Sequence, residues 1–241
     1  MSLLEEGQKT RLGIVGGMGP LASTEFVRTI YDYSLADRLE QCTPVVSLYS
    51  DPTIPDRTEA LLKGEDAAVL RQLTEALRYL AATGATKIVV CCMTIHYMLP
   101  KLPPALGSNI ISLLDVIYAN LAKRRGRHLV LCSSGTRKLR LFEGHDSWEQ
   151  FSDFLIFPDE RDQRLLHEEI IYPLKRNPDM PALVSALESM LERYEVDSFI
   201  AGCSEIHIIA KRLNAPASGH KVYGCIDPLD ILARELAEGR I

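Results

Sequence analysis

Short apolar runs alternate along the chain with longer amphipathic stretches. The short runs are partly β-branched, which is typical of buried strands, and the longer stretches carry apolar residues every three or four positions, which predicts helices. The predicted strands cover residues 11–15, 43–49, 87–91, 128–132, 154–157 and 197–202. The predicted helices cover residues 21–37, 65–82, 113–124, 160–175, 181–194 and 227–238, and another begins at residue 137. Strands that alternate with helices form parallel sheets, so we expect an α/β protein.

The second half of the chain repeats the order of the first. Each half opens with a strand and a turn of small residues, at 16–19 and at 133–136, before its helices and later strands. We therefore expect two similar lobes, residues 1–112 and 113–226, related by a pseudo-twofold axis, each a parallel sheet flanked by helices. The last helix, within 227–241, has Asp227 as its expected N-cap and can pack back onto the first lobe. The cleft between the lobes is the expected active site.

A five-residue pattern, Cys-x-x-Ile-His, occurs twice, each time directly after a predicted strand. It places Cys92 and Cys203 at the carboxyl ends of parallel strands, where open α/β sheets bind ligands. Helix-terminal N–H groups favour a thiolate there, so both sulfurs are candidate acids and bases. If they face a small molecule from opposite sides, one removes a proton and the other delivers one, which inverts a carbon centre.

The residues beside the two cysteines have alternative roles. Adjacent strand residues point to opposite sides, so Cys91 and Cys92 cannot both face the cleft, and the repeat selects Cys92. His96 and His207 lie four residues beyond their cysteines, and each either supports its thiol or caps buried polar groups. Zinc is an alternative for these Cys–His pairs, but structural zinc sites usually draw on Cys–Cys or His–His pairs, so we expect no metal.

The glycine-rich turn at 17–22 fits the dinucleotide fingerprint, but the acidic residue of that fingerprint is missing from the end of the second strand. The nearest candidate, Asp51, heads a Pro-rich loop at 51–58. What remains is a set of backbone N–H groups that can hold a carboxylate or phosphate, or a tight turn without a ligand. The turn residues concerned are Met18 and Gly19 and, in the second lobe, Ser133, Ser134 and Thr136.

Composition narrows the class of protein. The 241 residues are 46% hydrophobic and 24% charged, as in a soluble globular protein, and a net charge of −5 with one short basic tract at 123–127 argues against nucleic acid. No apolar stretch approaches the ~20 residues of a membrane span, and residues 1–6 lack a signal-peptide pattern. We therefore expect a cytoplasmic protein without a membrane partner. Cys42, Cys132 and Cys225 are then expected to be small buried hydrophobic residues.

Four segments together resemble the aspartate/glutamate racemase superfamily, and within it the aspartate racemase branch. They are residues 13–20, 51–58, 92–96 and 202–205, in the expected order over nearly the whole chain, and the Asp-Ser-Gly hallmark of glutamate racemases is absent. The resemblance implies a homodimeric, cofactor-independent enzyme of two α/β lobes that racemises an acidic amino acid. Its two catalytic cysteines would be Cys92 and Cys203.

The resemblance also implies how the substrate is held. Arg57 would grip the side-chain carboxylate, to which its planar fork is suited, and Lys175 would add a second cation by a looser match. A surface salt bridge and a helix C-terminal lysine are the alternatives for these two residues. Glu205 can hold a substrate ammonium or pair with an imidazole, and Thr94 either binds substrate or caps a helix. The full set of expected substrate-binding residues is Met18, Gly19, Arg57, Met93, Thr94, Ser133, Ser134, Thr136, Lys175, Ser204 and Glu205.

Two positions depart from the family pattern. Met93 stands where the family has an Asn whose amide helps to hold the α-carboxylate, and losing such a bond costs about 1–3 kcal/mol. Ser204 replaces a Thr but keeps the hydroxyl. Three functions therefore stay open. The leading one is a two-base racemase; the others are a cysteine-dependent isomerase or decarboxylase of small dicarboxylates, and a homologue that binds dicarboxylates or amino acids without turnover.

Overall fold

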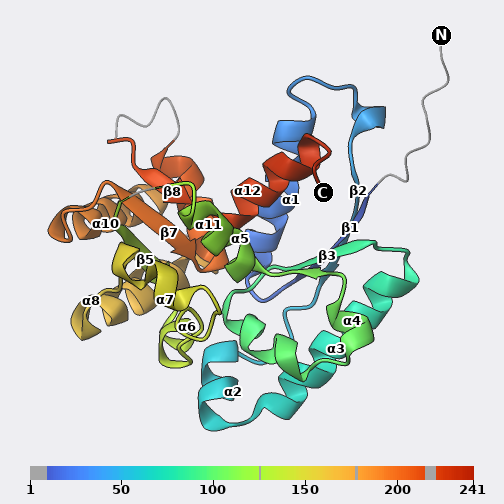
Figure 1. Cartoon of the computed structure of the whole chain (residues 1–241), viewed down its shortest axis with the longest axis horizontal. Helices are drawn as coiled ribbons and strands as arrows, with labels where there is room; N and C mark the ends of the chain where they lie inside the picture. Colours follow the sequence, from blue (N-terminus) through green and yellow to red (C-terminus); the bar gives the residue numbers. More distant parts are fainter. Residues whose placement is uncertain (1–9, 125, 177–178, 215–220) are drawn as a thin grey trace.

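Two parallel four-stranded sheets lie side by side, each flanked by helices (Figure 1). The structure is a computed structural model that describes residues 10–124, 126–176, 179–214 and 221–241. Residues 1–6, which lack a signal-peptide pattern, and Arg125 of the basic tract lie outside the described residues. The expected α/β class with two similar lobes is confirmed.

The two sheets have the same strand order. In the first sheet the order is β2-β1-β3-β4, and in the second it is β6-β5-β7-β8, with every pair parallel. The first sheet consists of β1 (Arg11–Gly16), β2 (Val45–Ser50), β3 (Lys87–Val90) and β4 (Ile110–Ile111). The second consists of β5 (His128–Cys132), β6 (Leu155–Ile156), β7 (Ser198–Gly202) and β8 (Gly224–Ile226). Corresponding strands therefore end at corresponding places in the two lobes.

Helices connect the strands and cover the sheets. The first lobe has α1 (Pro20–Ser34), η1 (Glu40–Cys42), α2 (Arg57–Lys63), α3 (Asp66–Ala82), η2 (Thr94–Lys101) and α4 (Pro104–Gly107). Then follow α5 (Leu113–Leu121), α6 (Ser134–Lys138), α7 (Trp148–Phe151), η3 (Ser152–Phe154), α8 (Glu160–Leu165), η4 (Leu166–Ile171), α9 (Tyr172–Leu174), α10 (Met180–Arg193), α11 (Ser204–Leu213) and α12 (Pro228–Ala237). No helix among these described residues is long and apolar enough to span a bilayer.

Several elements differ from the sequence prediction. The predicted loop at 51–58 ends in a helix, because the side chain of Asp56 accepts from Glu59 N at 3.1 Å and caps α2. The predicted helix at 160–175 is divided into α8, the π-helical η4 and α9, and Pro173, which lacks an N–H, lies in the last of these. Strands β4 and β8 were not predicted because runs of two and three residues carry no readable periodicity.

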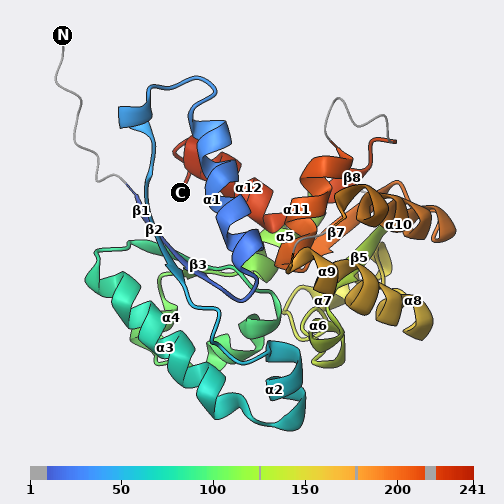
Figure 2. The same ribbon diagram turned by 180° about the vertical axis from the view of Figure 1, so that it is seen from behind.

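The last helix lies on the first lobe. Although α12 follows the second sheet in sequence, it packs along α1, and the two helices run side by side in both views (Figures 1 and 2). The cap of α12 agrees with the sequence prediction, since Asp227 accepts from Leu229 N at 3.0 Å and Asp230 N at 3.3 Å. Phe26 and Ile30 of α1 join one apolar cluster with residues of α12 and of the second sheet. The two lobes therefore share a core.

Helices α2 and α6 join the lobes at a second place. Their contact brings Gly135 of α6 against α2, and a Cβ on Gly135 would lie 2.6 Å from Thr58 Oγ1. The close approach therefore requires glycine at this position. The lobes are therefore joined at both the α1–α12 and the α2–α6 contacts.

Replacing Phe26 by Ala should lower the free energy of unfolding by about 3–5 kcal/mol, because the ring is fully buried in the shared core. Urea denaturation measures this change. Leu35→Ala is the matched control, since this side chain is half exposed at the end of the same helix and its loss should change the free energy by about 0.5 kcal/mol or less. Equal losses in the two variants would contradict a core shared through α1.

Candidate functional site

The two repeated cysteines lie at the carboxyl ends of equivalent strands. Cys92 follows β3, Cys203 follows β7, and each residue is only 7% exposed. Cys203 precedes α11 directly, whereas Cys92 is separated by Met93 from a 3₁₀ helix that contains Pro100. Cys91 packs in the core on the opposite side from Cys92, and burial raises the pKa of its thiol well above the usual value. Cys92 instead packs with Met18 and Ile54, beside Arg57.

The carboxylate of Glu205 contacts the thiol of Cys203. Cys203 Sγ donates to Glu205 Oε2 at 2.8 Å, and Ser204 Oγ donates to the same oxygen at 3.2 Å. Burial, the charge of Glu205 and this hydrogen bond raise the pKa of the Cys203 thiol well above its usual value, against the opposing charge of Lys175. The other oxygen, Oε1, is buried without a partner among the described residues, and a Cβ on Gly19 would overlap it.

Arg57 lies between two loops of the first lobe, beside Cys92. Its guanidinium donates to Met18 O at 2.5 Å, Ile54 O at 3.1 Å and Pro55 O at 3.0 Å, so it holds both loops in place. Burial lowers the pKa of Arg57, but the charge of Cys92, with other acidic groups and a hydrogen bond to Cys92, raises it overall. The residue is 8% exposed and Nε is buried without a partner among the described residues. Arg57 is therefore a buried cation and not a surface salt bridge.

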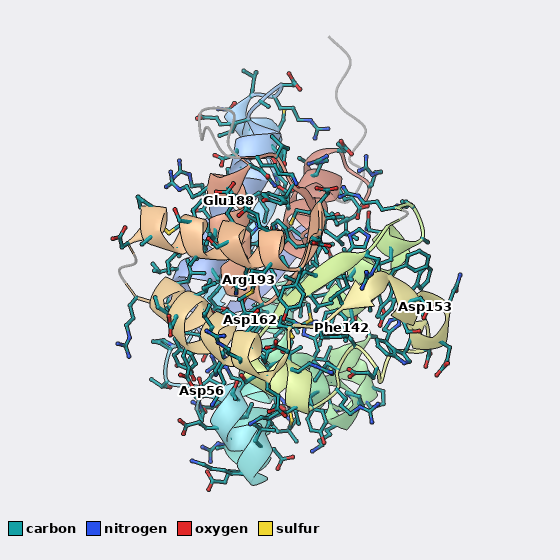
Figure 3. The ribbon with its side chains drawn as sticks, turned by 90° about the vertical axis from the view of Figure 1, so that its left-hand side faces the viewer. Asp56, Phe142, Asp153, Asp162, Glu188 and Arg193 are labelled. Carbon is teal, nitrogen blue, oxygen red and sulfur yellow. The ribbon has the colours of Figure 1, made fainter. Side chains whose placement is uncertain are left out.

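Lys175 and Asp56 face each other across the lobes. Lys175 Nζ lies 3.7 Å from Asp56 Oδ2, which also accepts from Tyr172 Oη at 3.1 Å, and Asp56 lies at the start of α2 (Figure 3). Burial lowers the pKa of Lys175, but the charges of Glu205 and Cys203 help to raise it overall. Burial works against ionisation of Asp56 too, yet its bond from Glu59 N and the charge of Lys175 leave its pKa lowered. Both groups are thus charged at neutral pH.

Three hydroxyl groups connect the lobes next to the cysteines. Thr94 Oγ1 lies 2.9 Å from Ser133 Oγ and 3.0 Å from Thr136 Oγ1, and all three residues are buried. Thr94 is therefore not a helix cap. Ser134 is not part of this group. Its N–H donates to His167 Nδ1 at 3.4 Å, and the residue lines a surface cavity. The structure thus brings Ser133 and Thr136 to Thr94 and leaves Ser134 outside this group.

The two histidines of the repeat have different partners. His96 accepts from Leu113 N at Nε2 (3.1 Å), so Nδ1 carries the proton and donates to Cys92 O at 2.9 Å. Burial lowers the pKa of His96 to about 4, which keeps the ring neutral. His207 instead bonds to Asp227 Oδ2 at 2.6 Å and to Thr29 Oγ1 at 2.9 Å, on the side of α1. His96 supports the Cys92 backbone, and His207 holds the junction of the lobes.

The two methionines of the expected site occupy different clusters. Met18 packs in the same cluster as Cys92 and Ile54. Met93 is buried in the shared core with Ile14 and Leu113, so the structure does not place its thioether among the polar groups around the thiols. Met93 thus fills apolar space instead of replacing a hydrogen bond.

The remaining cysteines only partly follow their prediction. Cys132 is buried, as expected. Cys42 is exposed, so the prediction was wrong there, and Cys225 is only half-buried. Cys42 lies in the single turn η1, which contains no buried residue. No group of three His, Cys, Asp or Glu side chains suited to a metal ion occurs among the described residues.

Sequence reasoning missed Asp56, Tyr172 and His167. Asp56 could have been found as a helix N-cap, because it precedes Arg57 and accepts from the N–H three residues on. Tyr172 and His167 carry no local signal: their rings pack edge to face, and only the fold brings them to Asp56 and Ser134. Burial lowers the pKa of His167, and the charge of Lys175 adds to this effect.

The thiol cluster is largely buried, since Cys92 and Cys203 are each 7% exposed and Glu205 is 2% exposed. Three surface cavities of about 830, 630 and 810 Å³ open on the described part of the chain, and none is lined by Cys92, Cys203 or Glu205. The cluster combines two thiols with a carboxylate and two cations, which suits proton transfer on a molecule that carries carboxylate groups.

Comparison with known proteins relates the fold and most of the chain to one family. A family model described as Asp/Glu/Hydantoin racemase matches residues 15–236. An aspartate racemase from Picrophilus torridus is 24% identical, with 95% of this chain and 94% of that chain covered and a TM-score of 0.77. An aspartate racemase homologue from Pyrococcus horikoshii is 18% identical, with coverage of 95% and 98% and a TM-score of 0.63.

A more distant match widens the comparison. A glutamate racemase from Francisella tularensis in complex with D-glutamate is 12% identical, with 96% of this chain and 80% of that chain covered and a TM-score of 0.58. At these identities the solved structures show a common fold.

Replacing His96 by Asn should flatten the dependence of stability on acid pH. The native pKa of about 4 lies below the unfolded value of 6.5, so the neutral ring stabilises the fold above pH 6.5 and this contribution is lost as the pH falls toward 4. The difference in unfolding free energy between wild type and His96→Asn should shrink by about 3 kcal/mol over that range. Urea denaturation at several pH values measures it.

His207→Gln provides the control with the opposite sign. Burial lowers the pKa of His207, but Asp227 raises it overall. The contribution of His207 to the free energy of unfolding is therefore present at low pH and is lost as the pH rises through its pKa in the native protein. The difference between wild type and this variant should grow on acidification. The same pH trend in both variants would contradict the assigned protonation states.

Proposed function

The chain belongs to the Asp/Glu/hydantoin racemase family, and we propose on this basis that it racemises an acidic amino acid by proton transfer between Cys92 and Cys203, without a cofactor. One thiolate removes the α-hydrogen, and the opposing thiol delivers a proton to the other face of the carbon. Each turnover moves the thiol proton from one sulfur to the other. The two cysteines then exchange roles for the reverse direction.

The observation that carries the proposal is the placement of the two sulfurs. They follow equivalent strands of two sheets with the same order, both are buried, and they are near enough for the charge of Cys92 to contribute to the raised pKa of Cys203. Burial and Glu205 raise the pKa of the Cys203 thiol more than Cys92 does. A pair of thiols from facing lobes is the arrangement that two-sided proton transfer needs.

Charged groups around the thiols support an acidic substrate. The buried Nε of Arg57, which has no partner in the part of the chain that the structure describes, is a donor for a carboxylate, and Lys175 adds a second positive charge from the other lobe. The hydroxyls of Thr94, Ser133 and Thr136 are candidates for the second carboxylate. Because Met93 packs in the core, the α-carboxylate contact assigned to Asn in the family has to come from other groups here, and these hydroxyls supply it.

Wild-type protein in D₂O should exchange the α-hydrogen of aspartate or glutamate as it racemises them. Cys92→Ala and Cys203→Ala should each lower the racemisation rate by about 100-fold or more, because each removes one partner of the proton transfer. NMR follows the exchange and chiral chromatography follows the enantiomers. Cys42→Ala is the matched control, since this thiol is exposed in η1 and its loss should leave the rate unchanged.

Three results would contradict the proposal in different ways. Absence of exchange by wild type with acidic amino acids excludes a racemase of this substrate class. A covalent adduct on one cysteine, with chemistry surviving loss of the other, indicates a nucleophilic isomerase or decarboxylase. Tight binding of a dicarboxylate by calorimetry without exchange indicates a homologue that binds without turnover.

Lys175→Met should raise KM for an acidic substrate about 10-fold or more while kcat changes little. The variant keeps most of the apolar side chain but removes the charge that faces Glu205 and Cys203. Steady-state kinetics with aspartate and glutamate measures the effect. Lys63→Met, on the exposed face of α2, is the matched control and should leave KM unchanged. An unchanged KM for Lys175→Met would remove this residue from substrate binding.

A further inference from the structure

Glu205 makes the two thiols unequal. Its Oε2 accepts the hydrogen bond of Cys203 Sγ at 2.8 Å. A carboxylate that is 2% exposed therefore contacts one of the two reacting sulfurs. Beside the other sulfur, Cys92, stands the guanidinium of Arg57. A neighbouring anion favours a thiol and a neighbouring cation favours a thiolate, so the two lobes give the sulfurs opposite electrostatic surroundings.

We propose that Glu205 keeps the proton on Cys203 in the resting protein, so that Cys203 starts as the acid and Cys92 starts as the base. The proposal rests on the two-cysteine function. It adds Glu205 as the residue that determines which sulfur carries the proton before the reaction. One turnover leaves the proton on Cys92 Sγ and a thiolate on Cys203, next to the carboxylate. The resting state is restored when one proton passes back from Cys92 to Cys203.

The other charges near Cys203 do not cancel this effect. Lys175, at the end of α9, opposes it, while Cys92, after β3, adds to it, and both act more weakly on Cys203 than Glu205 does. Glu205 is also held in place. Ser204 Oγ donates to the same oxygen, and the β1–α1 turn leaves room for Oε1 only because residue 19 is glycine. Gly19 has extended backbone, with φ of 166°, so its role here is space and not conformation.

The asymmetry has a kinetic signature. Two enantiomers have equal free energy in water, so kcat/KM is the same for both at every pH. If one starting state is preferred, the two enantiomers differ in KM and in kcat, and both constants differ by the same factor. The enantiomer whose α-hydrogen faces Cys92 binds the resting form directly and has the lower KM. The other enantiomer binds only the minor form in which the proton lies on Cys92, and its KM and kcat are both higher.

Peptide-resolved alkylation by iodoacetamide, followed by mass spectrometry across pH, tests the proposal on the full chain. In Glu205→Gln the alkylation midpoint of Cys203 should fall by at least about one pH unit, because the negative charge beside the sulfur is gone while the shape is kept. The Cys92 midpoint should move less. Glu192→Gln, an exposed change on α10, is the matched control and should move neither midpoint. An unchanged Cys203 midpoint in Glu205→Gln overturns the proposal.

Two further measurements test the proposal without relying only on the alkylation of Glu205→Gln. Gly19→Ala places a Cβ where Glu205 Oε1 lies, so it should displace the carboxylate and lower the Cys203 midpoint without a substitution in α11. In Glu205→Gln the KM values of the two enantiomers should also approach each other, and a ratio equal to that of wild type counts against the proposal. If wild type shows no α-hydrogen exchange, the racemase function fails, whereas the alkylation result still decides whether Glu205 holds the Cys203 proton.

Discussion

A buried carboxylate between the two lobes is the constraint on which the rest of the site depends. A charge taken out of water is costly unless partners compensate it, and Glu205 is 2% exposed with one oxygen that has no hydrogen-bond partner among the described residues. Its compensation comes from both lobes, since its charge contributes to the raised pKa values of Arg57 and of Lys175. The packing of the lobes, the position of the two cations and the protonation of the Cys203 thiol therefore all depend on the charge of Glu205.

The junction of the lobes supports that arrangement from the far side. His207 bonds to Asp227 and to Thr29, and Lys211 pairs with Glu25, so α11 is tied to α1 and α12 along its length. Since α11 starts directly after Cys203, these bonds fix the direction from which the thiol approaches the first lobe. The packing of α12 on α1 then makes the relative position of the sheets a property of the shared core.

The repeated Cys-x-x-Ile-His pattern is symmetric in position but not in chemistry. Both isoleucines are fully buried, which accounts for their recurrence. The histidines differ, because a neutral His96 supports the Cys92 backbone and His207 pairs with Asp227. The residues between them differ as well: Thr94 joins a group of hydroxyls, whereas Glu205 supplies a charge. One lobe thus offers a sulfur beside a cation and the other a sulfur beside an anion.

The sequence by itself determined the alternation of strands and helices, the two equivalent strand ends that carry the cysteines, and the cap at Asp227. These features depend on local periodicity and on neighbouring residues. Only the tertiary structure decided that Met93 packs in the core, that Arg57 holds backbone carbonyls, and that His207 meets Thr29, 178 residues away. Burial, pairing and protonation depend on groups from distant segments, and no local pattern records which segments meet.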